Sequence, residues 1–323
     1  MGVESIGSAA MWIGFTIFVL AMLALDLGVF HRKAHVVRVR ESLAWTLVWI
    51  LLSLLFGAFV FVRFGEDRAL EFLTGYLIEK ALSVDNLFVF LVIFSYFSVP
   101  PALHHKVLAW GILGALVMRA VFIVVGAALL QRFHWFIYLF GGFLVFTGIK
   151  ILVTRGGEVH PERNPVLRLF RRLVRAVPDY RGSRFWVIER ARWHATPLLM
   201  VLVVVEATDV VFAVDSIPAI FAVTEDPFIV YSSNIFAMLG LRALYFVLAG
   251  MLVKLVYLKV GLGLVLAFVG VKMLVADLVK IPIAVSLGIV AALIGASVAA
   301  SLLRPARRPP LPIHPPHGGE STA

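Results

Sequence analysis

An all-α membrane protein that crosses the bilayer about nine times is the architecture expected from this sequence. Its 323 residues are 61% apolar and 15% charged, and the mean hydropathy is +0.99. A soluble domain is about 45–50% apolar and about 25% charged, so an ordinary soluble enzyme is excluded. The apolar residues form long continuous runs, as membrane helices require, whereas the strands of a membrane barrel alternate over about ten residues.

Nine apolar runs are long enough to be spans. In chain order they cover roughly residues 11–30, 43–62, 70–97, 107–130, 133–153, 197–223, 230–253, 260–278 and 281–303. These runs divide the chain into six predicted parts. The parts are two N-terminal helices at 1–69, a three-helix unit at 70–154, a basic cytoplasmic loop at 155–195, a second three-helix unit at 196–279, a final helix at 280–303 and a disordered cytoplasmic tail at 304–323.

The distribution of basic residues predicts the orientation. Twenty of the 29 Lys and Arg residues fall in alternate loops, four fall in the opposite loops and five lie inside spans. Cytoplasmic loops of membrane proteins carry an excess of Lys and Arg. The sequence therefore predicts a multi-pass protein of the inner cell membrane, with its N-terminus outside and its C-terminus in the cytoplasm. The same topology accounts for the net charge of +10, and no nucleic-acid partner is expected.

The basic loop at 155–195 is the one sizeable segment outside the predicted spans. Asn164 and Pro165 predict the start of a helix, and Pro178 predicts its end. Apolar residues at helical spacing alternate with Arg residues between these points, which indicates a basic amphipathic helix lying on the inner leaflet. Residues 184–188 and 192–196 are expected to pair as a short hairpin. Docking of a partner protein is the alternative role for this loop.

Eleven charged residues lie within the predicted spans. The acids are Asp26, Glu79, Asp85, Glu206, Asp209 and Asp215, and the bases are Lys80, Arg119, Lys150, Arg242 and Lys272. A charge at the bilayer centre costs about 2.5–3.5 kcal/mol, so these side chains must face one another or water. Salt bridges that hold the bundle together explain four of the bases, Arg119, Lys150, Arg242 and Lys272. They explain the acids poorly, because five of the six acids lie on two helices with few bases beside them.

The two helices that carry these acids resemble each other. Glu79 and Asp85 are six residues apart, as are Asp209 and Asp215. In the spans that follow, Met118-Arg119-Ala120 matches Leu241-Arg242-Ala243, and Gly148-Ile149-Lys150 matches Gly270-Val271-Lys272. Spans 3–5 and 6–8 are therefore predicted to be two three-helix repeats. Because each repeat has an odd number of spans, the second repeat is inverted in the membrane. Inverted repeats are common in transporters, and the site then lies near the midplane, where the repeats meet.

Oxygen donors lie along these helices, which predicts a site for a hard cation. Pro218 is expected to break its helix and free a carbonyl, and Asp85-Asn86 is expected to mark the equivalent place. A break or a water pocket is required because Asp209 and Asp215 fall about 120° apart on a straight helix. The predicted ligands are Glu79, Asp85, Asn86, Glu206, Asp209 and Asp215, supported by Ser83, Ser216, Pro218, Arg119 and Arg242. The chain has no cysteine, and an all-oxygen site suits Mg²⁺, Ca²⁺ or Mn²⁺; a proton-only pathway is the alternative.

Several long motifs resemble the TerC/Alx family of bacterial membrane proteins. They are LALDLGVFHRKAHVV at 23–37, GYLIEKALSVDNLFVF at 75–90, FSYFSVP at 94–100, VEATDVVFAVDSIPAIFAVTEDPFIV at 205–230 and SNIFAMLGLRALYF at 233–246. The resemblance covers roughly residues 10–280 and implies a member of the lysine-exporter superfamily that exports manganese. It also implies that Asp26 is the first-span Asp of the family. The residues that would occupy the acidic motifs of the family are Glu79, Asp85, Asn86, Glu206, Asp209, Asp215 and Ser216.

The expected function is export of a divalent cation, with Mn²⁺ as the transported substrate and no tightly bound cofactor. A negative cell interior draws Mn²⁺ inward by about 4.6 kcal/mol at about 100 mV, so export must be coupled. Crowded carboxylates at low dielectric have raised proton affinity, which makes the proton the expected coupling ion. The alternative is a membrane partner that assists the metalation or assembly of other membrane or secreted proteins.

No enzymatic activity is expected, because no Ser-His or His-metal arrangement is visible within the predicted spans. Tellurium resistance, which the family name refers to, is expected to be indirect, because an acidic pocket repels an oxyanion. The expected partners are the cation, the lipid bilayer and either a second copy of the chain or another membrane protein.

Overall fold

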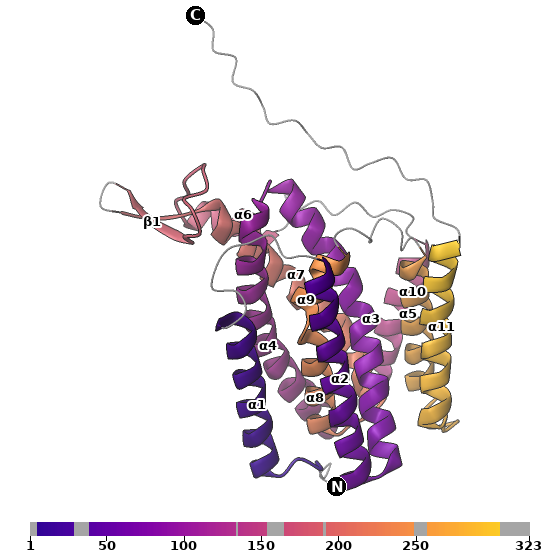
Figure 1. The fold of residues 1–323 in the computed structure, drawn as a ribbon. Coiled ribbons are helices and arrows are strands. Elements are labelled where there is room, and N and C mark those ends of the chain that lie inside the picture. The colour runs from indigo at the N-terminus through magenta and orange to yellow at the C-terminus, as the bar shows by residue number, and fades with distance from the viewer. Residues whose placement is uncertain are drawn as a thin grey trace, which may run out of the picture.

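A computed structural model describes residues 5–28, 39–133, 135–153, 165–189, 192–248 and 257–303, and these residues are mostly helical (Figure 1). The helices are α1 (Ala9–Gly28), α2 (Val39–Phe64), α3 (Glu66–Tyr96), α4 (Pro101–Arg132), α5 (Phe136–Val153), α6 (Pro165–Leu173), α7 (Pro197–Phe221), α8 (Pro227–Met238), α9 (Leu241–Leu248), α10 (Leu258–Leu274) and α11 (Ile283–Leu303). Strands β1 (Trp186–Glu189) and β2 (Arg192–Ala195) pair as an antiparallel hairpin. The predicted hairpin and the helix predicted to start at Asn164-Pro165 are therefore present. The end predicted at Pro178 is wrong, because α6 ends at Leu173 and the backbones of Arg175 and Val177 hydrogen-bond to Ala195 of the hairpin instead.

Among the residues that the structure describes, six helical segments are long and apolar enough to cross a membrane. They are Arg40–Phe64, Pro101–Leu130, Phe136–Val153, Pro197–Phe221, Pro227–Val247 and Ile283–Leu303, and Ala9–Leu25 is a shorter apolar helix. α3 and α10 are not among these six. α3 has 31 residues but carries seven charged ones, and α10 has only 17 residues. The prediction of a helical, multi-pass membrane protein is confirmed, whereas nine spans stay a prediction.

The connections between the helices gather at the two ends of the bundle. Figure 1 shows the N-terminal segment and the α2–α3, α7–α8 and α10–α11 connections at one end, and α6 and the hairpin at the other. A hydrogen bond of 3.1 Å from Ser5 Oγ to Asp226 Oδ1 ties the N-terminal segment to the α7–α8 connection. This arrangement agrees with the alternation of loops that the basic residues predict.

The breaks expected at Pro218 and at Asp85-Asn86 are wrong. α7 continues through Pro218, and α3 continues through Asp85 and Asn86. Pro218 is tolerated because it lies in the last turn of α7, where the helix is about to end in any case. Asp85-Asn86 causes no break because both residues have only mildly unfavourable helix propensities.

A break occurs instead between α8 and α9, inside the span predicted at 230–253. Gly240 has a φ of +86° at this point, a conformation that glycine adopts readily. A Cβ at Gly240 would also lie 2.7 Å from the Trp49 ring, so the close approach of α2 requires glycine. The break exposes carbonyls at the end of α8, and Lys80 Nζ donates a hydrogen bond of 3.1 Å to one of them, the oxygen of Ala237. A cation at the C-terminus of a helix is stabilising.

α5 and α10 approach each other closely through four glycines. A Cβ at Gly148 would lie 2.6 Å from the carbonyl oxygen of Gly263, and a Cβ at Gly270 would lie 2.7 Å from that of Gly141. Small residues let membrane helices pack with their backbones in contact, which compensates for the weak hydrophobic drive between helices in lipid. The α5–α10 pair is therefore tightly packed, and it lies next to α11 at one side of the bundle (Figure 1).

Candidate functional site

A fully buried arginine lies where α3, α4, α7 and α8 meet. Arg119 of α4 has no exposed surface. Its Nη1 donates to Glu79 of α3, to Ser216 Oγ of α7 at 3.2 Å and to Asn234 Oδ1 of α8 at 3.2 Å. Its Nη2 lies 3.5 Å from Asp209 Oδ1 of α7. One guanidinium group therefore holds side chains from three other helices together.

The Glu79 carboxylate accepts hydrogen bonds from several donors. Besides the bond from Arg119, it accepts one of 3.2 Å from Asn234 Nδ2 and one of 3.4 Å from Ser83 Oγ. Glu79 is fully buried, and an ionised carboxylate in such a place needs charge and hydrogen-bond compensation. Glu79 is thus the well-compensated acid of the site.

Asp209 is compensated less completely. It is 4% exposed, and its Oδ2 has no hydrogen-bond partner among the described residues. Nε and Nη2 of Arg119 also lack hydrogen bonds there. Most buried polar atoms in native proteins are hydrogen-bonded, and an unsatisfied buried group costs about 1–3 kcal/mol. The Asp209 oxygen is therefore a place where a water, a proton or a cation would be stabilised.

A small cavity with a mixed lining lies next to this cluster. Its volume is about 60 Å³, more than the roughly 10–15 Å³ that one water requires. Asn86 of α3, Asp215 and Ser216 of α7 and Lys259 of α10 supply its polar lining. The rest of the lining is apolar: Leu82, Ile151, Phe212, Leu262 and Leu266. Thr147 of α5 donates a hydrogen bond of 3.4 Å to Asp215 Oδ1. Ser216 lines the cavity and also binds Arg119, so it connects the two parts of the site.

The predicted site residues thus fall into groups. Glu79, Asp209, Arg119, Ser83 and Ser216 form the buried cluster, and Asn86 and Asp215 line the cavity. Glu206 is turned toward α4, because a Cβ at Gly114 would lie 2.1 Å from its Oε1. Pro218 lies in the last turn of α7, and Arg242 is buried in the first turn of α9. The side chains of Asp26 and Asp85 lie outside the described part of the structure.

No three His, Asp or Glu side chains converge in a metal-binding arrangement in the part of the chain that the structure describes. Arg119 instead separates the two acids of the cluster, and Asp215 lies on another face of α7. The assignment of metal ligands therefore stays a prediction.

Two polar residues of the site were not predicted from the sequence. Asn234 is fully buried and binds both Arg119 and Glu79, and Lys80 binds the end of α8. The signal for Asn234 is the run Ser232-Ser233-Asn234, three consecutive polar residues inside an apolar span. The sequence predicts Lys80 as a buried charge, but its partner is a backbone carbonyl, which no acidic residue in the sequence indicates.

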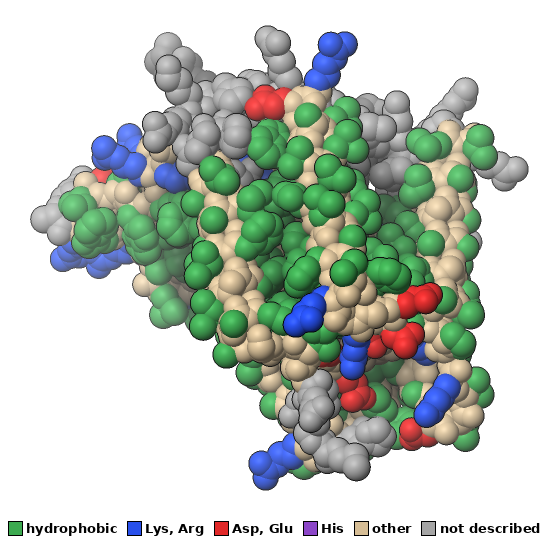
Figure 2. Space-filling view, turned by 60° about the horizontal axis from the view of Figure 1, so that its bottom comes forward, with side chains coloured by type: hydrophobic (Ala, Val, Ile, Leu, Met, Phe, Trp, Pro, Cys, Tyr) green, Lys and Arg blue, Asp and Glu red, His purple; other side chains and the backbone are tan. Residues whose placement is uncertain are grey.

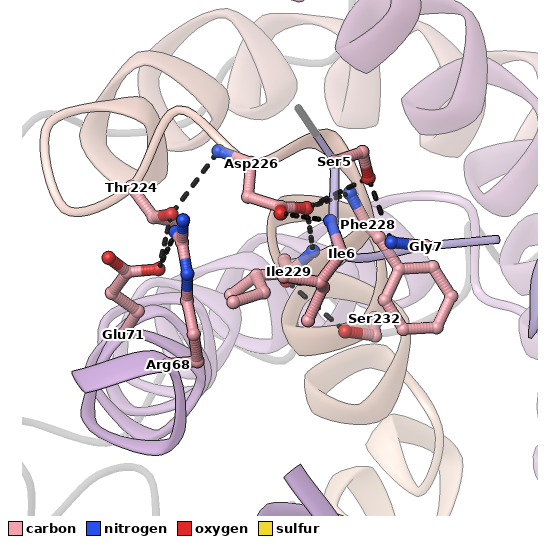
Figure 3. A network of polar contacts seen from close by, with 10 residues as sticks. All are labelled: Ser5, Ile6, Gly7, Arg68, Glu71, Thr224, Asp226, Phe228, Ile229 and Ser232. Carbon is pink, nitrogen blue, oxygen red and sulfur yellow. Dashed lines mark hydrogen bonds and ion pairs between the residues drawn. The ribbon is translucent and has the colours of Figure 1, made fainter. Parts of the chain in front are cut away.

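A second polar network lies at the end of the bundle that carries the N-terminal segment (Figure 3). Glu71 Oε2 accepts hydrogen bonds from Arg68 at 2.9 Å and from Thr224 Oγ1 at 2.6 Å. Asp226 caps α8 by accepting from the backbone of Phe228 at 2.9 Å, and it also accepts from Ile6 N at 2.7 Å. Charged side chains of both signs gather on this end (Figure 2). The network joins α3 to the α7–α8 connection and to the N-terminal segment.

Known proteins are similar to the chain over almost its whole length. The uncharacterized membrane protein STKORF319 of Myxococcus xanthus is 56% identical over 305 residues, which are 94% of this chain and 96% of that protein. The putative membrane-bound redox modulator Alx of Escherichia coli (strain K12) is 48% identical over 296 residues, which are 89% of this chain and 92% of that protein. An uncharacterized membrane protein of Rickettsia bellii is 39% identical over 293 residues, which are 91% and 97% of the two chains. No solved structure matches the chain.

One family description matches most of the chain. It is that of the integral membrane protein TerC family, and the match covers residues 64–308. This range holds the buried cluster around Arg119, the cavity beside Asp215 and the network around Glu71. The resemblance drawn from the sequence motifs is confirmed, and the chain belongs to the TerC family of integral membrane proteins.

Proposed function

We propose that this protein exports a divalent cation, Mn²⁺, across the inner cell membrane in exchange for protons. The observation that carries the proposal is the unpartnered Oδ2 of Asp209, a nearly buried carboxylate oxygen. Two acids and one arginine form the core of the cluster, so a proton or a cation is attracted to the negative charge that Arg119 leaves uncompensated. The cavity beside the cluster has room for water.

The chemistry of the surrounding groups supports a hard cation. Carboxylate, amide and hydroxyl oxygens of Asp215, Asn86 and Ser216 line the cavity. Such ligands favour Mg²⁺, Ca²⁺ and Mn²⁺ over ions that prefer nitrogen or sulfur. We assign Glu79, Asp85, Asn86, Glu206, Asp209 and Asp215 as the residues that bind the ion in the course of transport, and choose Mn²⁺ because the family resemblance implies it.

The glycine contacts support an inverted repeat within a nine-span topology. Adding the offset of 122 residues converts Gly141 into Gly263 and Gly148 into Gly270. The Gly141–Gly270 contact and the Gly148–Gly263 contact are therefore exchanged by the proposed repeat symmetry. Inverted repeats that rock against each other around a midplane site are the usual basis of alternating access.

Proton exchange supplies the energy in this proposal. Outward movement of Mn²⁺ opposes about 4.6 kcal/mol at about 100 mV, so the empty carboxylates must return carrying protons. Asp209 and Asp215 alternate between a metal-bound and a protonated form, while Glu79 stays bonded to Arg119. The name of the Escherichia coli relative describes a redox modulator. This chain has no cysteine, so we assign it no thiol chemistry.

Cytosolic manganese in cells grown with excess Mn²⁺ tests the proposal. Cells that express the parent chain should hold less manganese than cells that lack it. Asp209→Asn and Asp215→Asn should each abolish this difference, while Asp67→Asn, at an exposed acid near the start of α3, should keep it. A blot of the membrane fraction checks that each variant is present.

Two results would count against the proposal. If the Asp209 and Asp215 variants both protect as well as the parent, the acids serve only as salt bridges. If the parent alters no divalent metal, the alternative of a membrane partner for metalation or assembly replaces transport.

A further inference from the structure

The segment from α6 to the hairpin exposes apolar side chains outside the bundle. Val166, Leu169 and Leu173 of α6 are 45%, 57% and 75% exposed. At 100° per residue they fall within about 60° of one another, so they form one stripe. The neighbouring face of α6 contacts the bundle, since Leu167 is buried and Phe170 packs against the core of the bundle. α6 is therefore attached to the protein by one part of its apolar face and leaves the rest uncovered.

The hairpin presents a second apolar surface. Ile188 pairs with Trp193 and Trp186 pairs with Ala195, so these side chains lie on one face. Trp186, Ile188 and Trp193 are 42%, 62% and 65% exposed. Figure 1 shows the hairpin extending sideways from the bundle at the level where the helices end. In Figure 2, which brings the opposite end of the bundle forward, hydrophobic side chains cover this projecting part and Lys and Arg side chains lie at its margins.

The same segment is strongly basic. Residues 165–196 contain eight Arg and two acids, Asp179 and Glu189. Glu189 forms an ion pair of 3.1 Å with Arg181. Among the described residues, Arg168, Arg172, Arg175, Arg184 and Arg192 are exposed and have no carboxylate within ion-pair distance. At 100° per residue, Arg168 and Arg172 lie about 130° and about 90° from the centre of the exposed apolar stripe of α6, so they flank it.

Specific contacts hold the segment in place on the bundle. Tyr180 Oη donates a hydrogen bond of 2.8 Å to the carbonyl oxygen of Phe97, at the end of α3. Burial raises the pKa of Tyr180 to about 12, so this donor keeps its proton at physiological pH. Lys106 of α4 lies 4.8 Å from the centre of the Phe185 ring. The apolar and basic surfaces therefore have a defined position relative to α3 and α4.

We propose that α6 and the hairpin form one binding surface for anionic phospholipids. Its apolar side chains would enter the interface between headgroups and acyl chains, and its arginines would bind the acidic headgroups. Tryptophan is favoured at this depth. Basic amphipathic segments bind anionic bilayers both by inserting apolar side chains and by electrostatic attraction to the acidic headgroups. The outside of the bundle also exposes large apolar side chains, among them Val117, Val121 and Val124 of α4. The inference is independent of the transported ion.

A fluorescent label at single cysteines tests this surface in the full-length protein, because the chain has no native cysteine. Ile188→Cys and Glu189→Cys place an environment-sensitive dye on opposite faces of β1. Each variant is reconstituted in nanodiscs of phosphatidylcholine alone and of phosphatidylcholine with an equal part of phosphatidylglycerol. We expect the dye at 188 to shift to the blue and to be quenched by lipids with a shallow spin label, strongly with phosphatidylglycerol and weakly without it. The dye at 189 should report water in both.

Charge variants separate lipid recognition from simple insertion. Arg168→Gln, Arg172→Gln and Arg175→Gln combined should remove the dependence on phosphatidylglycerol, and the matched triple Lys variant should keep it. An aqueous signal at 188 in anionic nanodiscs would overturn the proposal. So would equal insertion in both lipids, or a blue shift that spin-labelled lipid does not quench, because the latter would mean contact with protein.

Discussion

Arg119 makes it feasible to bury acids from two helices at the same place. Without it, Glu79 and Asp209 would both be buried charges with no basic partner in the cluster. The arginine fork reaches both acids, Ser216 and Asn234 at once, which the single ammonium group of a lysine cannot do. The incomplete compensation of Asp209 is the feature that distinguishes this cluster from a purely structural salt bridge.

Replacing Arg119 tests this role. Arg119→Ala leaves two buried acids without a partner, and breaking a buried pair in this way costs about 3–5 kcal/mol. We expect a large loss of thermal stability in detergent and loss of manganese export. Arg119→Lys keeps the charge and should retain partial activity. Equal stability of the Ala variant and the parent would show that the acids are protonated and that Arg119 is not needed to balance them.

Asn234 should be required for the position of Glu79 more than for folding. Asn234→Ala removes one acceptor for Arg119 and one donor to Glu79, each worth about 1.5–3 kcal/mol when the partner is charged. Manganese export should fall several-fold. Ser232→Ala is the matched control on the same helix, because Ser232 bonds only to the backbone of its own turn in the described structure. Similar losses in both variants would mean that α8 simply tolerates no change.

At the level of helices, α5 and α10 pack with their backbones in close contact at two places. The glycines at both crossing points have no room for a side chain. Thr147 of α5 donates a hydrogen bond of 3.4 Å to Asp215 of α7. The site residue Asp215 is therefore linked directly to the α5–α10 pair.

Gly148→Ala tests the close packing. The added methyl group would meet the Gly263 carbonyl oxygen and the Ala267 backbone, so the helices must separate. Overpacking costs about 1–3 kcal/mol, and we expect a corresponding fall in the midpoint of thermal unfolding in detergent. Gly142→Ala is the control, since a Cβ at Gly142 meets nothing within 4 Å. Unfolding of the two variants at the same temperature would show that α5 and α10 leave room for a methyl group at Gly148.

The sequence predicts where the helices of this fold lie along the chain better than it predicts which helices pack against each other. Hydropathy identified the apolar helices, and the cost of a buried charge singled out Glu79, Asp209 and Arg119 as residues that must find partners. Which base meets which acid depends on how helices pack, and a pattern along one helix carries no such information. The break expected at Pro218 is wrong because the effect of a proline on a helix depends on how far the proline lies from the end of the helix. The break at Gly240 was missed because glycine is common inside membrane helices.

For the molecule as a whole, the alternation of helix ends agrees with the charge distribution along the chain. Acidic and basic side chains gather around Glu71 at one end, and the arginine-rich α6 and hairpin lie at the other. The buried cluster lies on α3, α4, α7 and α8, between these ends. A transporter with its site between two polar ends needs a defined orientation in the bilayer, and the excess of arginine at the α6 end predicts that this end is cytoplasmic.

Labelling of single cysteines in intact cells tests the orientation. Glu225→Cys lies in the α7–α8 connection and should react with an impermeant thiol reagent added outside. Ser183→Cys lies near the hairpin and should react only after the cells are opened. Both residues are exposed, so accessibility of the position itself does not limit the reaction. The reverse pattern would invert the orientation and make the proposed export an import.

Transport by the purified protein in liposomes tests the central claim most directly. A metal-sensitive dye inside the liposomes reports entry of Mn²⁺, and the lumen is made acidic so that protons leave as the metal enters. The proposal predicts rapid entry with the parent protein, slower entry without the pH gradient, and entry no faster than in protein-free liposomes with Asp209→Asn. Entry through the Asp209→Asn variant at the rate of the parent, or no entry through the parent, would contradict it.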